Sequence, residues 1–413
     1  MMRGHRTRSA SAARWLLAAV ILTAAPAFAS LIESSEGAAL VVRARFGAVS
    51  RVDRHGMRAE VHVLDVVASR AETGGGIVVA WEELSSRRPP RFSERDEVLL
   101  VLEPLPSSSL WQRRYAAEVK PVYAVGERGA AYLPAPDAAS VQALRNYLSL
   151  APAALQGVEG AAALARMAGR DALALHALAR LETHPGLDHE SVASGRAEVA
   201  AALAEVAEDP RRPARARVAA VDLAGKRHLQ AMMPALSRLA REGSPLEANA
   251  LEAIAALAGG LDAEAALKLT ARNDPALRAL GARHLRGTEA RARLPRLARS
   301  DPSPLVRRAA AETLAGSGTP WGMEAAVASL DDADAAVRSG AAKSIAARGA
   351  DAIPFLQTAL APGNGGAPGA IATLSLMGPT GRTTLTAAAA HHPDERIRTL
   401  AELALGRGPG HRH

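Results

Sequence analysis

Apolar residues recur in the C-terminal half of the chain as nine-residue stripes at positions i, i+4 and i+8, with a small residue in the middle. The clear copies are Leu246-Ala250-Ile254, Leu277-Gly281-Leu285, Val306-Ala310-Leu314 and Val337-Ala341-Ile345. The weaker copies are Arg215-Ala219-Leu223, Pro368-Ala372-Leu376 and Ile397-Ala401-Leu405, and Leu173-Ala177-Leu181 is an outlier. Apart from the outlier, successive copies start 29 or 31 residues apart. A fixed period of this length is typical of stacked repeats.

Each stripe predicts a helix with one apolar face, because positions four residues apart lie on the same side of a helix. A small central residue lets a neighbouring helix approach closely, while the larger residues at each end fill the space beside it. One such helix cannot bury its face alone. We therefore expect residues 138–406 to form an α-solenoid of helical hairpins.

A polar pattern accompanies the stripes. An Asp stands three residues before three of them and fits the helix N-cap, where its carboxylate can accept backbone N–H groups. An Arg follows four residues after each of these Asp, and Arg307 follows four residues after Ser303. The residues of this pattern are Asp274, Arg278, Arg307, Asp334, Arg338, Asp394 and Arg398.

The motif D-x-x-V-R-x-x-A-x-x-x-L, as it stands from Asp334 to Ile345, resembles HEAT-like repeats of the phycobilisome-lyase type. The resemblance implies that the turn Asp and the following Arg form a structural ladder between neighbouring repeats. The arginines could instead be a stripe that binds an acidic ligand. Three units hold Ala216, Glu247 or Gly369 at the Arg position, which weakens both interpretations there.

Residues 30–137 have a different pattern. Residues 40–46 and 58–67 are partly alternating, β-branched runs, and residues 77–81 and 98–102 are shorter apolar runs. Turn-forming Gly and Pro residues separate them. Five or six strands in about 100 residues predict a small closed or sandwiched β module.

The segment from Phe92 to Leu102, followed by Tyr123 and a Gly turn, resembles exported bacterial OB-like modules, which are distantly similar to netrin-type barrels. Arg95 stands where that pattern usually has Gly. The resemblance implies an OB-like barrel and no particular function. The fold expected overall is therefore multidomain α+β, with a small barrel before the solenoid.

Residues 1–29 predict a secretory signal peptide, with a basic start, the apolar run 15–22 and the Ala27-Phe28-Ala29 cleavage motif. Cleavage between Ala29 and Ser30 would export the chain to the periplasm or the cell exterior. The alternative is an uncleaved anchor, but the run is short for a span of about 20 residues. We expect no membrane span in the mature chain and a disordered tail at 407–413.

The amino-acid composition excludes several kinds of site and gives no sign of a nucleic-acid surface. The absence of cysteine excludes disulfides, thiolate catalysis and Cys-based zinc sites. The formal charge is +8, and removing the four arginines of the leader leaves +4. Acidic residues are interspersed with basic ones, so nothing indicates a nucleic-acid surface.

No catalytic motif stands out, and we predict no cofactor and no metal. The adjacent His391 and His392 would point apart on a helix. Some HEAT-like chains, the di-iron deoxyhypusine hydroxylases, use several His-Glu pairs, whereas this sequence has one, His189-Glu190. Two tryptophans are partner-binding candidates. The favoured alternative for Trp321 is a local helix staple, and Trp111 could equally be buried against the barrel edge.

These observations favour an exported, non-enzymatic interaction scaffold whose solenoid surface binds a protein or peptide. The alternative is an enzyme or enzyme subunit with a site in the β module or at the module boundary, which clustering of His55 and His62 with nearby acids would favour. A third possibility is a structural role in an envelope assembly.

Overall fold

The computed structural model describes residues 31–70, 76–82, 91–105, 107–118, 120–125, 131–188 and 193–406. The chain forms two compact units, Met1–Leu239 and Ala240–His413. The predicted leader with its Ala29/Ser30 cleavage site, the 407–413 tail and the His189-Glu190 pair lie outside the described residues. The first unit holds the β module together with the first helices, and the second unit is helical.

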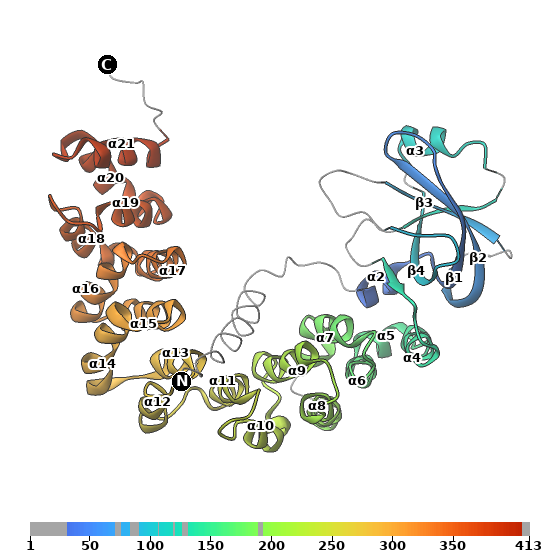
Figure 1. Cartoon of the computed structure of the whole chain (residues 1–413), viewed down its shortest axis with the longest axis horizontal. Helices are drawn as coiled ribbons and strands as arrows, with labels where there is room; N and C mark the ends of the chain where they lie inside the picture. Colours follow the sequence, from blue (N-terminus) through green and yellow to red (C-terminus); the bar gives the residue numbers. More distant parts are fainter. Residues whose placement is uncertain are drawn as a thin grey trace, which may run out of the picture. The chain divides into compact units, whose positions relative to one another are not determined.

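The described strands of the first unit form one six-stranded sheet (Figure 1). Its strands are β1 (Leu40–Arg51), β2 (Gly56–Ser69), β3 (Gly76–Glu82), β4 (Glu97–Pro104), β5 (Val122–Val125) and β6 (Tyr132–Pro134). The order β1-β2-β3-β5-β4 closes on itself because β1 pairs with both β2 and β4, and β6 is added to β4. The β3–β5 pairing is parallel and the others are antiparallel. The predicted small barrel is confirmed.

The barrel core is built from alternate residues of the strands around a group of aromatic rings. Phe46 of β1 stacks on Phe92 with ring centroids 4.3 Å apart, and Trp81 of β3 meets Phe92 edge-on at 5.1 Å. Arg95, in the turn before β4, has φ 76°. This left-handed conformation favours glycine, the residue expected at that position from the resemblance.

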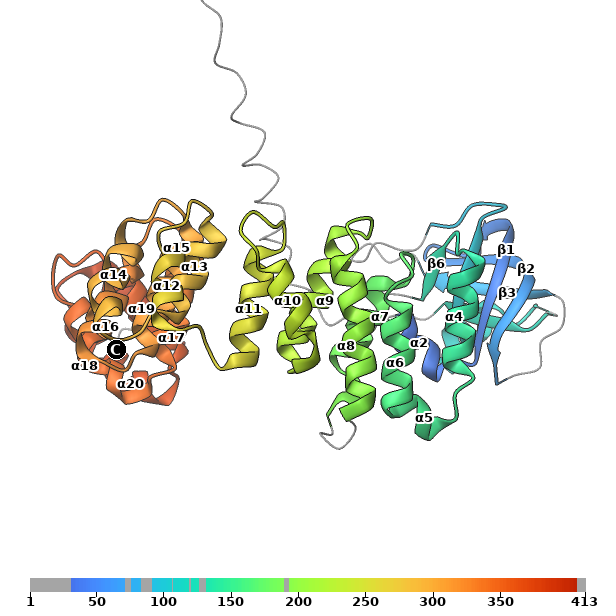
Figure 2. The ribbon, with the colours of Figure 1, turned by 90° about the horizontal axis from the view of Figure 1, so that it is seen from below.

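The helices of the first unit follow the barrel in two rows, except that α2 precedes β1 and α3 lies between β4 and β5. Figure 2 shows α4 beside the barrel, and α4 contacts β2. The helices are α2 (Leu31–Gly37), α3 (Ser109–Arg114), α4 (Ala138–Leu148), α5 (Pro152–Gln156), α6 (Val158–Met167), α7 (Ala174–Glu182), η1 (Pro185–Leu187), α8 (Ala193–Glu208), α9 (Ala214–Lys226), η2 (Gln230–Met232) and α10 (Met233–Leu239).

The second unit is a stack of helical hairpins. The stripe helices α13, α15, α17, α19 and α21 contact one another in sequence, and the other helices form a second row beside them (Figure 1). The elements are α11 (Glu247–Ala258), α12 (Ala263–Leu269), α13 (Pro275–His284), α14 (Gly287–Ser300), α15 (Pro304–Gly316), α16 (Pro320–Ala328), η3 (Ser329–Asp331), α17 (Ala335–Ala346), η4 (Gly349–Ala352), α18 (Ile353–Ala359), α19 (Ala367–Leu376), α20 (Pro379–His391) and α21 (Glu395–Ala404).

The small stripe centres lie between helices where the pattern is clear. Ala250, Ala310, Ala341 and Ala401 have no exposed surface. At Gly281 an added Cβ would lie 2.7 Å from the carbonyl oxygen of Ala266, so α12 and α13 pack closely enough to require glycine there. These contacts are the ones that the stripe predicts.

Two of the weaker copies are wrong in register. Pro368, Ala372 and Leu376 are all exposed, and Leu376 keeps 58% of its surface. Helix α19 instead buries Ala370 and Leu374. The physical reason is that the backbone at Gly369 lies against Leu330, where an added Cβ would be 2.7 Å from the Leu330 Cβ.

The copy at 215 is displaced by one residue. Arg215 is exposed and Ala219 is half-buried, while Ala216, Ala220 and Ala224 are buried. Helix α9 therefore buries alanines at all three positions of this spacing, beside Val221 and Leu223, and a search for larger end residues passes over that register.

Candidate functional site

The aspartates of the polar pattern lie at helix N-termini. Asp274 Oδ1 accepts the Ala276 N–H at 2.7 Å, Asp334 Oδ1 accepts the Ala336 N–H at 2.8 Å, and Asp394 Oδ1 accepts the Arg396 N–H at 2.8 Å. Ser303 holds the same position but makes no capping bond with its side chain. These carboxylates therefore satisfy backbone donors of their own helices.

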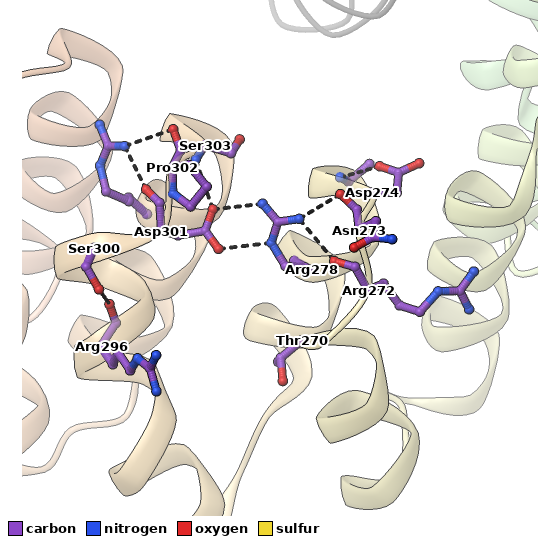
Figure 3. A network of polar contacts seen from close by, with 12 residues as sticks. Thr270, Arg272, Asn273, Asp274, Arg278, Arg296, Ser300, Asp301, Pro302 and Ser303 are labelled. Carbon is purple, nitrogen blue, oxygen red and sulfur yellow. Dashed lines mark hydrogen bonds and ion pairs between the residues drawn. The ribbon is translucent and has the colours of Figure 1, made fainter. Parts of the chain in front are cut away.

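The arginines connect neighbouring repeats through other acids. Arg278 donates from Nε to Asp301 Oδ2 and from Nη2 to Asp301 Oδ1, both at 2.9 Å (Figure 3). Its Nη1 donates to the carbonyls of Arg272 and Asn273, at 3.0 and 2.8 Å. Asp301 comes from the next turn, 23 residues along the chain. One guanidinium therefore holds its own turn and the following repeat together.

Arg307 and Asp332 form the same kind of inter-repeat ion pair, or rung, one repeat further along the chain. Arg307 donates to the Asp332 carboxylate from Nε at 2.8 Å and from Nη2 at 3.0 Å. Its Nη1 donates to the Asp301 carbonyl at 2.9 Å. The bonds from Arg307 lower the pKa of Asp332, and the bonds from Asp332 raise the pKa of Arg307. Both side chains are largely buried, at 15% and 9% exposure. Such bidentate, charge-assisted pairs are stronger than neutral hydrogen bonds.

The inter-repeat acids Asp301 and Asp332 were missed by the sequence analysis. Each stands two residues before a cap position, and its Oδ1 accepts the N–H two residues on, from Ser303 or Asp334. The signal that could have found them is an acid two residues before the cap, in register with the preceding Arg. The aspartates expected in the ladder cap helices instead.

A third rung has the opposite polarity. Glu247 occupies the helix position of Arg278 and Arg307, and Arg272 occupies the turn position of Asp301 and Asp332. The two form an ion pair at 3.1 Å, and Arg272 also pairs with Glu242 at 3.1 Å. Glu247 thus continues the ladder with its charges exchanged.

Two further arginines, Arg338 and Arg398, make the backbone contacts of this arrangement. Arg338 Nη1 donates to the carbonyls of Asp332 and Ala333 at 2.7 and 2.9 Å. Arg398 Nη1 donates to the carbonyls of His392 and Pro393 at 2.7 and 3.1 Å. Among the residues that the structure describes, no acid lies within ion-pair distance of Arg338.

A cleft of about 480 Å³ opens beside these turns. Its walls come from α14, the turn after it, α16 and η3, and its charged lining residues are Arg299, Asp301, Arg307, Asp331 and Asp332. The carboxylates of Asp301 and Asp332 that reach it are already held by arginines. The cleft is therefore a polar recess at the edge of the repeats.

The two tryptophan candidates are packed into the protein to different degrees. Trp111 lies in α3, is 7% exposed and packs with Ala80, Tyr115 and Ala124 against the barrel. This is the burial that the sequence analysis held open as an alternative. Trp321 is half-buried in the first turn of α16 and contacts the apolar core of the second unit.

The histidines of the sequence analysis are not brought together. His55 and His62 are both exposed on the barrel, and in the described ranges no group of three metal-ligating side chains could hold an ion. His391 is exposed, whereas His392 is buried with its Nε2 2.7 Å from the Leu360 carbonyl oxygen. His392 thus connects two neighbouring turns of the second unit.

A buried ion pair joins the start of the described chain to the helices of the first unit. Glu36 of α2 accepts two bonds from Arg180 of α7, at 2.7 and 3.0 Å, and one from the Tyr147 hydroxyl of α4 at 2.6 Å. Burial, followed by the Glu36 hydrogen bond, raises the pKa of Tyr147. Nothing in the sequence pattern singles out these three residues, because they are far apart along the chain.

Comparisons with known proteins bear on the helical hairpins. Residues 290–366 match a family model described as HEAT repeats. The helical hairpins within residues 290–366 therefore match HEAT repeats. The HEAT match covers α15 to α18 and most of α14, and so includes the Arg307–Asp332 rung and Arg338.

A search of curated proteins found no match to the chain. Among solved structures, human deoxyhypusine hydroxylase in complex with glycerol is 18% identical, with 60% of this chain and 95% of that chain covered. The TM-score is 0.22. A similarity at that level carries no argument about the activity of the HEAT repeats here.

Proposed function

We propose that this protein is an exported, non-enzymatic scaffold whose HEAT repeats bind a protein or peptide partner. The observation that carries the proposal is the run of stacked hairpins from α11 to α21, with small residues buried between layers and HEAT repeats matched at 290–366. Repeats that contact only their neighbours present long continuous surfaces, which suit extended partners.

The inter-repeat rungs support this proposal because they fix the repeats against one another. Arg278–Asp301 and Arg307–Asp332 each tie a helix to its own turn and to the next repeat. A surface held in one arrangement before binding loses less conformational entropy when a partner docks.

Export is supported by the leader pattern and by the residues that follow it. Leu31 and Ile32 have no exposed surface, so α2 is anchored directly after the predicted cleavage site. Among the described residues no helix has the length and apolar character needed to span a bilayer. N-terminal sequencing of the protein recovered from periplasmic extract should begin at Ser30. A chain that keeps residues 1–29 in the membrane fraction would contradict export.

Partner binding is tested with the full mature chain immobilised and exposed to periplasmic extract. We expect reproducible enrichment of a protein over empty beads and over an unrelated exported repeat protein, followed by saturable binding of the purified partner. If no protein exceeds both controls across salt conditions and cross-linkers, the scaffold role is wrong.

A further inference from the structure

The Arg338 side chain makes the same backbone contacts as the two paired arginines, Arg278 and Arg307. In Arg278, Arg307 and Arg338, Nη1 donates to backbone carbonyls five or six residues earlier in the chain. The Arg278 and Arg307 side chains are 15% exposed, and Arg338 is also partly buried. Because a guanidinium is planar and rigid, fixing Nη1 also fixes the edge formed by Nε and Nη2. In Arg278 and Arg307, that edge holds a carboxylate.

The turn before α19 has no acidic residue of its own. Asn364 stands two residues before Gly366, the N-cap residue of α19. Asp301 and Asp332 likewise stand two residues before the N-cap residues of α15 and α17. The Asn364 Oδ1 accepts the Gly366 N–H at 3.0 Å, as the two aspartates do with their own turns. The Asn364 amide is uncharged and has only one acceptor oxygen, so it cannot offer a guanidinium edge the two carboxylate oxygens that Asp301 and Asp332 provide.

The position of Asn364 is more exposed than the positions of the two aspartates. Asn364 is exposed, whereas the side chains of Asp301 and Asp332 are only 6% and 9% exposed. An added Cβ at Gly363 would meet nothing within 4 Å. Asp332, in the turn whose carbonyls Arg338 contacts, has its two carboxylate oxygens bound by Arg307, and the Asp331 carboxylate lies against the backbone of Gly365.

We propose that Arg338 is a preformed receptor for a carboxylate, and that an Asp or Glu side chain of an acidic partner segment completes this rung. The proposal rests on the scaffold function and names the chemistry of its partner. A carboxylate is the expected occupant because the same fork already holds a carboxylate in two neighbouring repeats. The acidic-ligand interpretation of the arginine stripe thus applies to Arg338, and the structural interpretation applies to Arg278 and Arg307.

The test measures fluorescence anisotropy of a labelled hexa-aspartate peptide with the full mature protein at low ionic strength. A hexa-asparagine peptide of the same length is the uncharged control. We expect Arg338→Gln to weaken binding of the aspartate peptide about tenfold or more, the scale of a bidentate charged contact. The matched control Arg291→Gln removes an exposed arginine of α14 and should change the affinity less than about twofold.

A second variant supplies a carboxylate for Arg338 from the protein's own chain. Asn364→Asp restores the acid of the other rungs, so it should weaken peptide binding as Arg338→Gln does and should raise the melting temperature. Gln357→Glu adds the same charge on exposed α18 of the same repeat and should do neither. The Asn364→Asp variant is expected to fold, so its loss of binding cannot be ascribed to unfolding.

Three outcomes would overturn the receptor: no binding of hexa-aspartate to the wild-type protein, equal binding by wild type, Arg338→Gln and Asn364→Asp, or tighter Arg338-dependent binding of a phosphoserine peptide. Failure of the scaffold function is recognised separately in the extract experiment. If the wild type and Arg338→Gln recover the same partner equally, the scaffold stands and the receptor is wrong. If the wild type recovers nothing, the scaffold itself is wrong.

Discussion

Glu247 and Arg272 form an inter-repeat ion pair whose charges are exchanged relative to Arg278–Asp301 and Arg307–Asp332. Here the helix residue carries the negative charge and the turn residue carries the positive charge. The two residues are 25 positions apart in the sequence, as they are in the Arg307–Asp332 rung. The stacking geometry therefore specifies that opposite charges meet at these two positions. It does not specify which helix or turn carries which sign.

Neutralising either member of this reversed pair should destabilise the second unit, and the two effects should not add. Glu247→Gln keeps an acceptor for the Gly243 N–H. A double-mutant cycle of Glu247→Gln and Arg272→Gln therefore isolates the free energy of the ion pair. We expect a coupling free energy of about 1 kcal/mol, measured by urea unfolding. The exposed pair Lys268–Glu264 is the control and should couple by less than about 0.5 kcal/mol. Additive effects at Glu247 and Arg272 would contradict the rung.

The two kinds of aspartate should differ in their contribution to stability. Asp301→Asn breaks the bidentate contact and leaves the Arg278 guanidinium partly buried, so we expect a loss of about 2 kcal/mol in the free energy of unfolding. Asp274→Ala removes only a helix cap, which costs about 1 kcal/mol. Calorimetry or urea unfolding ranks the two variants. An equal or smaller loss for Asp301→Asn would show that the inter-repeat contact contributes little.

The Arg307–Asp332 rung should give a defined pH dependence. Because hydrogen bonding from Arg307 lowers the folded-state pKa of Asp332, this pair stabilises the fold above the unfolded-state pKa, and the contribution is lost as pH falls through the lowered value. The penalty of Arg307→Gln should therefore be full at pH 7 and shrink below about pH 4. Urea midpoints of both proteins at pH 7, 5 and 3 measure it. A penalty that stays constant down to pH 3 would be inconsistent with this pairing.

The strained turn in the barrel should be relieved by glycine. Arg95 is exposed, and its φ of 76° is disfavoured for a residue with a Cβ. Arg95→Gly should raise the stability of the first unit by about 0.5–1 kcal/mol, after the greater unfolded-state entropy of glycine is counted. Arg95→Ala keeps the Cβ and should bring no such gain. Equal effects of the two variants would point to charge rather than backbone conformation.

The buried pair at the start of the described chain should be costly to break. Arg180 and Glu36 have side chains that are 8% and 12% exposed, so Arg180→Ala leaves a buried carboxylate and should destabilise the first unit by about 3 kcal/mol. Arg166→Ala, which removes an exposed partner of Glu198, should cost less than about 1 kcal/mol. Thermal unfolding of the full chain compares them. Similar losses for both would mean that burial adds nothing to the Glu36–Arg180 pair.

The sequence by itself determined the features that depend on residues close together along the chain. The clear stripes identify the helix faces, the small centres identify the contacts between layers, and Asp274, Asp334 and Asp394 identify helix starts. A capping bond connects an aspartate to an N–H only two or three residues away, so local order is enough to find it. Arg95 marks a turn that usually needs glycine for the same local reason.

Only the tertiary structure decided which charges meet across repeats, because a rung joins residues 23 or 25 positions apart and depends on how the hairpins stack. It also decided the register of α9 and α19, where the burial of Ala216, Ala220 and Ala224 and the close approach of Gly369 to Leu330 override the stripe pattern. The burial of Trp111 and the meeting of Glu36, Tyr147 and Arg180 follow from the same cause. Such contacts are set by the packing of whole elements, which no short stretch of sequence contains.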